Sequence, residues 1–167
     1  MHALTFKSLV VCVCSVLMLG AAVNAQQVAP APPLPPTTFY GPPITLEQAK
    51  KAADAAMAEA TKRKMAMAIA IVEPSGDLVF FQRMDGTQYA SIQIAQDKAK
   101  SAALFRRSSK DFLDRVAKGD MSPFALHGAV ASAGGIPIVV NGKIIGAIGT
   151  SGGADDPIAQ AGADALK

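Results

Sequence analysis

Histidine is the side chain in this sequence best suited to bind a metal or to transfer protons near neutral pH. The sequence contains two histidines, and only His127 lies outside the N-terminal leader that is described below. A single histidine cannot form a zinc site, and no H-x-x-H or C-x-x-C spacing supplies partners. His127 can serve as one axial ligand of a haem iron. It can equally be a hydrogen-bonded loop or interface residue.

Two glycine-rich stretches resemble catalytic or phosphate-binding motifs. Residues 149–153 match G-x-S-x-G, the pattern of a nucleophilic serine at a sharp strand-to-helix turn. In that arrangement the histidine follows the serine, whereas His127 precedes Ser151, so we do not expect a hydrolase. No Lys-Ser/Thr pair follows Gly134-Gly135, as a phosphate loop requires. We therefore expect these glycines to serve tight turns and close backbone contacts.

Basic residues gather in the stretch between residues 98 and 118, interleaved with aspartates. They are Lys98, Lys100, Arg106, Arg107, Lys110, Arg115 and Lys118. A solvated helix face accounts for this pattern; the functional alternative is capture of carboxylates, which arginine binds in bidentate geometry. Lys98 and Arg106 stand out because apolar residues flank them. The formal net charge of +3 is small, and we expect no nucleic-acid partner.

The N-terminal 25 residues have the pattern of a signal peptide. Lys7 precedes an apolar run over residues 9–19, and small residues up to Ala25 form a cleavage site. Cleavage would remove both cysteines, Cys12 and Cys14, so the mature chain would form no disulfide and no thiolate metal site. We expect a periplasmic or secreted protein without an integral membrane span. Residues 26–43 contain seven of the eleven prolines and form a linker that cannot build a core.

The rest of the chain alternates helices with hairpins. Thr45 and Gln48 form a capping box that starts a helix running to about residue 64. Its expected buried side consists of Leu46, Ala49, Ala53, Ala56, Met57 and Ala60. Strands are expected over 65–72 and 78–84, and over 136–140 and 143–149 around an Asn-Gly type I′ turn. Further helices are expected over 91–105, from Ser108 or Ser109 to Gly119, and after Asp155 or Asp156. This order predicts an α+β domain with an antiparallel sheet covered by helices.

Several short segments occur in the order typical of one family. They are residues 72–78 (VEPSGDL), 83–86 (RMDG), 95–99 (AQDKA), 134–138 (GGIPI), 142–149 (GKIIGAIG) and 151–152 (SG). Over residues 44–167 the chain resembles the GlcG/HbpS family of haem-degrading domains, which includes the C-terminal domain of PduO-type proteins. The resemblance implies a profilin-like fold, with a five-stranded antiparallel sheet between helices in α/β/α layers. It also implies homo-oligomers, from dimers to octamers.

The resemblance implies an exported haem-binding protein, with a role in haem or iron scavenging, haem degradation or redox sensing. Haem is thus the expected cofactor. A threonine after the second helix is implicated as a haem ligand in the HbpS type, and Ser108-Ser109 occupies that region here. The expected site has apolar residues against the porphyrin, a cation on the propionates and a ligand near the iron. The apolar residues are Met84, Tyr89 and Phe105. The cation is Lys98 or Arg106, and the ligand near the iron is His127 or Ser109.

Two alternatives predict different structures. An enzyme or accessory protein acting on a small oxygenated acid or aldehyde would have a pocket around Lys98 and Gly134-Gly135 too small for a porphyrin. An oligomeric structural or signalling protein without a ligand would bury apolar surface between subunits and have no pocket.

Overall fold

The computed structural model describes residues 38–167. The expected signal peptide and the linker up to residue 37 lie outside this range. The described residues form helices, strands and one short 3-10 helix. In chain order they are α1 (Leu46–Lys62), β1 (Ala68–Val72), β2 (Leu78–Arg83), α2 (Ala90–Phe105), α3 (Ser109–Ala117), η1 (Ser122–Ala125), β3 (Gly135–Val140), β4 (Lys143–Ser151) and α4 (Asp155–Asp164).

Local sequence signals account for most of these boundaries. Thr45 and Gln48 form the predicted capping box at the start of α1. Asn141 and Gly142 both have positive φ (50° and 72°), as a type I′ turn requires. Of the two serines proposed as the cap of α3, Ser108 is the cap and accepts the Lys110 N–H. The predicted last helix is present as α4, but its predicted cap was wrong: the N-cap is Ala154, and both aspartates lie in the first turn.

One predicted core residue of α1 is also wrong. Leu46 was expected on the buried side, but it is 51% exposed. Ile44, one residue before the cap, is buried instead and donates its backbone N–H to Ile145 O at 2.7 Å. The buried stripe of α1 consists of alanines from Ala49 to Ala60.

Within residues 38–167 the strands form a single antiparallel sheet in the order β2-β1-β4-β3. The expectation of an antiparallel α+β fold is confirmed, but the described sheet has four strands where five were expected. β1 pairs with β4 only as far as Ala147. Beyond that residue, the segment that precedes α1 lies beside β4 in place of β1. Tyr40 forms a single parallel bridge with Ile144 there, so this segment contributes one bridge and no full strand.

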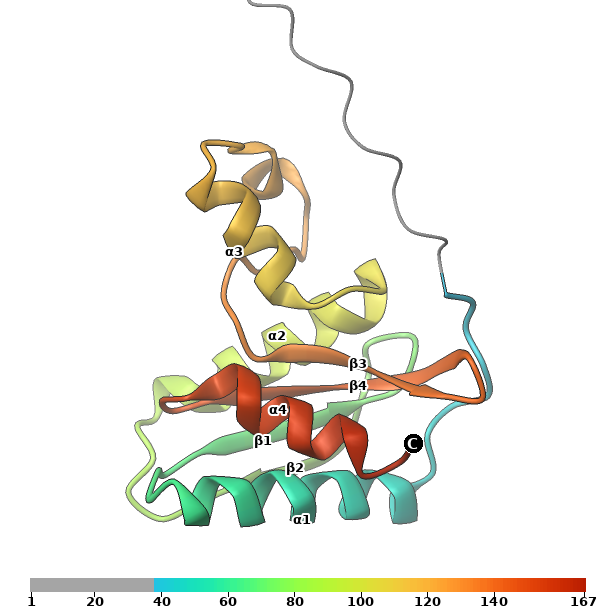
Figure 1. Cartoon of the computed structure of the whole chain (residues 1–167), viewed down its shortest axis with the longest axis vertical. Helices are drawn as coiled ribbons and strands as arrows, with labels where there is room; N and C mark the ends of the chain where they lie inside the picture. Colours follow the sequence, from blue (N-terminus) through green and yellow to red (C-terminus); the bar gives the residue numbers. More distant parts are fainter. Residues whose placement is uncertain (1–37) are drawn as a thin grey trace, which may run out of the picture. The chain divides into compact units, whose positions relative to one another are not determined.

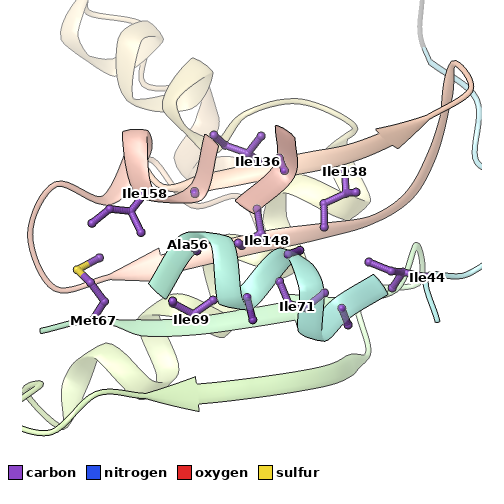
Figure 2. Packing of buried hydrophobic residues seen from close by; sticks show 14 of the residues in the cluster. Ile44, Ala56, Met67, Ile69, Ile71, Ile136, Ile138, Ile148 and Ile158 are labelled. Atoms are coloured by element: carbon purple, nitrogen blue, oxygen red, sulfur yellow. The ribbon is translucent and has the colours of Figure 1, made fainter. Parts of the chain in front are cut away.

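The two faces of the sheet are packed differently. Large aliphatic side chains fill the face toward α1 and α4, with Ile69, Ile71 and Ile148 among them (Figure 2). Alanines fill the opposite face, where Ala68 and Ala70 meet alanines of α2. A Cβ at Gly149 would lie 2.0 Å from the Ala95 carbonyl oxygen. Because the second face is built from such small residues, α2 lies close against the sheet.

Between α2 and β3 the chain makes a long excursion away from the sheet. We call residues 109–134 the α3 lobe; it comprises α3, η1 and the loop that leads to β3. In Figure 1 this lobe stands beyond β3, on the side away from α1. The excursion connects the end of α2 to the start of β3, and it contains His127.

Candidate functional site

The residues predicted to bind haem fall at different ends of α2. Met84 and Tyr89 precede the helix, whereas Phe105 ends it and Arg106 follows it. A helix of 16 residues is about 24 Å long. Tyr89, which is 82% exposed, therefore cannot share one porphyrin face with Phe105 in a single subunit. Met84 is half-buried, and its sulfur accepts the Met67 N–H at 3.4 Å.

Lys98 lies in the middle of α2 and is enclosed by protein. Its side chain is 2% exposed and forms an ion pair with Asp155, with 2.6 Å between Nζ and Oδ2. Nζ also donates a hydrogen bond to the Thr150 carbonyl at 3.2 Å. The other oxygen of Asp155 accepts the N–H groups of Gly152 and Gly153, each at 2.9 Å. Lys98 thus links α2 to the end of β4 and to α4, and its ammonium does not reach the surface.

Ser109 is also buried and holds the base of the α3 lobe. Its hydroxyl donates to the Ser132 carbonyl at 2.5 Å and accepts the Gly135 N–H at 2.9 Å. A Cβ at Gly135 would lie 2.3 Å from the Lys98 carbonyl oxygen, so only glycine fits there. These contacts make Ser109 a connection between α3 and β3.

The α3 lobe exposes apolar side chains next to the one histidine of the described residues. Met121 is 60% exposed, Phe124 is 66% exposed and Leu126 is 40% exposed. His127 follows directly in the chain and is exposed as well. Three large exposed apolar side chains within seven residues make this part of the lobe a candidate interaction surface. Sequence reasoning missed these three residues because η1 and its flanking loops have no apolar periodicity.

Aromatic contacts attach the lobe to the end of α2. The Phe105 and Phe112 rings meet edge to face with centroids 5.1 Å apart, and Phe112 is fully buried. Arg107 lies over the Phe112 ring at 5.7 Å. Such contacts between an aromatic pair and a cation fix the angle at which α3 leaves α2.

Arg106 occupies the C-cap of α2 in the left-handed conformation, with φ of 54°. Its guanidinium lies 5.4 Å from the centroid of the Tyr40 ring, and the Tyr40 hydroxyl donates to the Ala103 carbonyl at 2.8 Å. Arg106 itself is exposed and forms no ion pair within residues 38–167. It therefore presents a positioned cation beside the base of the lobe.

The loop between α3 and η1 has its own polar network. Asp120 accepts the Ser122 N–H and a hydrogen bond from Arg115 at 2.8 Å, while Arg115 also donates to the Ser122 hydroxyl at 2.6 Å. Hydrogen bonds from the Ser122 hydroxyl and N–H, followed by that from Arg115, lower the pKa of Asp120 to about 2. The carboxylate therefore stays charged at neutral pH and orders the turn that carries Met121.

Other kinds of site lack support among the described residues. In residues 38–167, no three histidine, cysteine or acidic side chains form a group that could hold a metal ion. Over the same range, no helix combines the length and the apolar character needed to cross a membrane. A pocket for a small acid was expected around Lys98 and Gly134-Gly135. At that place the Gly134 backbone packs against Asp155, and a Cβ built at Gly134 would lie 2.6 Å from the Asp155 Cβ.

The fold belongs to a class of α+β domain that is found in several solved structures. The chain superposes on an HbpS double mutant of Streptomyces reticuli with a TM-score of 0.69 and 29% identity, covering 83% of this chain and 97% of that one. It also shares its fold with the PduOC:heme complex, with a TM-score of 0.67 and 23% identity over 75% of this chain and 96% of that one.

Sequence comparison identifies the family. Residues 44–164 match the family described as "Haem degrading protein HbpS-like". An uncharacterized 15.0 kDa protein of Citrobacter freundii is 35% identical over 118 residues, which cover 66% of this chain and 80% of that protein. Protein GlcG of Escherichia coli K12 is 37% identical over 93 residues, which cover 56% of this chain and 69% of GlcG. The chain belongs to the HbpS-like family, and the predicted family membership is confirmed.

Proposed function

We propose that this protein binds haem on the α3 lobe. The observation that carries the proposal is the position of His127, which follows the exposed apolar residues Met121, Phe124 and Leu126 on one projecting lobe. Apolar side chains stabilise a bound porphyrin and histidine is a common ligand of its iron, and the lobe carries residues of both kinds. Membership of a family described as haem degrading supports the same conclusion.

The proposal assigns roles to residues of the lobe and its base. His127 would hold the haem iron, and Met121 and Phe124 would contact the porphyrin. Arg106 is the predicted cation that stays available for a propionate, and Lys118 at the end of α3 is a second. Bound haem would supply a redox-active iron. In this arrangement Lys98 and Ser109 have structural roles, because their polar atoms are engaged inside the protein.

A haem titration followed by Soret absorbance tests the proposal. We expect a saturable shift with one haem per subunit, and loss of that shift in His127→Ala. Phe124→Ala should weaken binding about tenfold or more, because it removes the side chain with the largest apolar area in the contact. Tyr89→Ala is the matched control, since this exposed aromatic residue lies at the far end of α2. Absence of a saturable shift, or equal losses in Tyr89→Ala and Phe124→Ala, would reject the site.

We also propose that the protein is exported and self-associates. The leader pattern supports export, and detection of a mature chain beginning at Gln26 by mass spectrometry of the exported fraction would test it.

The free edge of β2 supports self-association, because within the described sheet β2 pairs only with β1 and carries the half-buried residues Phe80 and Phe81. Unpaired edges of this kind attract a second chain. Light scattering after gel filtration should give a mass of at least two subunits, whereas a strictly monomeric mass would contradict the assignment.

A further inference from the structure

A small polar pocket lies between the β1–β2 turn and α2, apart from the α3 lobe. Two of the segments singled out in the sequence converge on it. Val72, Gly76 and Asp77 come from residues 72–78, and Asp97 comes from residues 95–99. The proposed haem site uses neither segment. The pocket is therefore a separate candidate for binding.

The turn and the helix are fitted to each other at this pocket. Gly76 has φ of 89°, and its N–H donates to the Glu73 carbonyl at 2.9 Å. A Cβ at Gly76 would lie 2.9 Å from Cγ of Lys100. Glycine at this position lets the turn lie directly against the Lys100 stem. Buried Val72 contributes an apolar wall.

Charges of both signs line the pocket, and each keeps free hydrogen-bonding capacity. Asp77 accepts the Ser75 hydroxyl through Oδ2 at 2.8 Å, and Asp97 accepts Nε2 of Gln93 through Oδ1 at 2.8 Å. Each carboxylate thus has a second oxygen that accepts no side-chain hydrogen bond from residues 38–167. Over that same range Lys100 forms no ion pair and no side-chain hydrogen bond, although it lines the pocket with both aspartates.

The volume suits a very small molecule. The pocket measures about 180 Å³, which is room for about six molecules of water at ~30 Å³ each. A ligand of about six heavy atoms fits, and a porphyrin does not. Two carboxylates call for an ammonium group, and one ammonium calls for a carboxylate.

We infer that this pocket binds a short-chain α-amino acid. The ligand's ammonium lies between Asp77 and Asp97, its carboxylate pairs with Lys100, and a small side chain contacts Val72. L-Alanine has six heavy atoms and carries all three features. The assignment does not depend on haem binding, because no residue of the α3 lobe takes part.

Titration of the full-length protein with L-alanine, glycine and L-serine, followed by amide NMR, tests the inference. We expect saturable shifts of the Gly76 amide and of the Gln93 side-chain amide at millimolar ligand or below. L-Lactate lacks the ammonium and ethylamine lacks the carboxylate, so each should bind about tenfold more weakly than L-alanine or worse. Absence of saturable shifts with all three amino acids, or equal binding of L-lactate, would overturn the assignment.

Matched variants separate this site from general charge effects. Lys100→Gln and Asp97→Asn should each weaken L-alanine binding about tenfold or more, because each removes a charged hydrogen-bonding partner. Lys50→Gln and Asp54→Asn make the same changes at exposed positions of α1, across the sheet, and should bind like the unmodified protein. Equal effects in both pairs would reject the pocket. Haem titration of the same variants should be unchanged, so failure of one site is distinguishable from failure of the other.

Discussion

The buried ion pair of Lys98 and Asp155 leads to an asymmetric prediction about stability. Lys98 is 2% exposed and Asp155 is 17% exposed. Asp155→Asn leaves the buried ammonium without a countercharge, and removing one partner of a buried pair costs about 3–5 kcal/mol. Lys98→Met should cost less, about 1–2 kcal/mol, because Asp155 keeps its two backbone N–H donors and some contact with water. The double variant should be more stable than the sum of the single losses predicts.

Urea unfolding followed by circular dichroism measures these differences. The exposed pair of Lys110 and Asp114, with side chains 46% and 48% exposed, provides the control. Asp114→Asn should change the free energy of unfolding by less than about 0.5 kcal/mol. The reasoning fails if Asp155→Asn is as mild as this control, or if Lys98→Met destabilises the protein as much as Asp155→Asn does.

Three further predictions concern packing and the lobe. Gly149→Ala should destabilise the protein by about 2–3 kcal/mol, because the new methyl group overlaps the α2 backbone. Gly86 has open space around it but a positive φ, so Gly86→Ala should cost about 1 kcal/mol in the same urea assay. Phe112→Ala should cost about 3–4 kcal/mol and speed hydrogen exchange in α3, since Phe112 is the fully buried contact of that helix with Phe105. The pKa of Asp120 lies below its ordinary value, so the stabilising contribution of this carboxylate is present above about pH 4 and is lost as the pH falls to about 2. Ser122→Ala should raise the pKa of Asp120 in an NMR titration. An unchanged pKa would contradict the assigned hydrogen bonds.

Much of the fold follows from local sequence signals. The capping box at Thr45, the turn at Asn141-Gly142 and the cap at Ser108 each involve groups within three residues of one another. Such signals depend on backbone conformation and on hydrogen bonds within one turn. For that reason the order of helices and hairpins was predictable. Family membership was predictable as well, because it rests on the order of segments along the chain.

The arrangement of the candidate sites depends on contacts that are distant in sequence. Lys98 and Asp155 are 57 residues apart, and their pairing decides that this lysine is buried. Tyr89 and Arg106 both seemed suitable for one porphyrin, yet α2 separates them by its whole length. The exposure of Met121 and Phe124 depends on which surfaces of the lobe the sheet leaves uncovered. Residue types and spacing therefore specified the elements and the available chemical groups. Only tertiary packing decided which groups are buried and paired and which meet solvent, because burial depends on neighbours that local sequence does not specify.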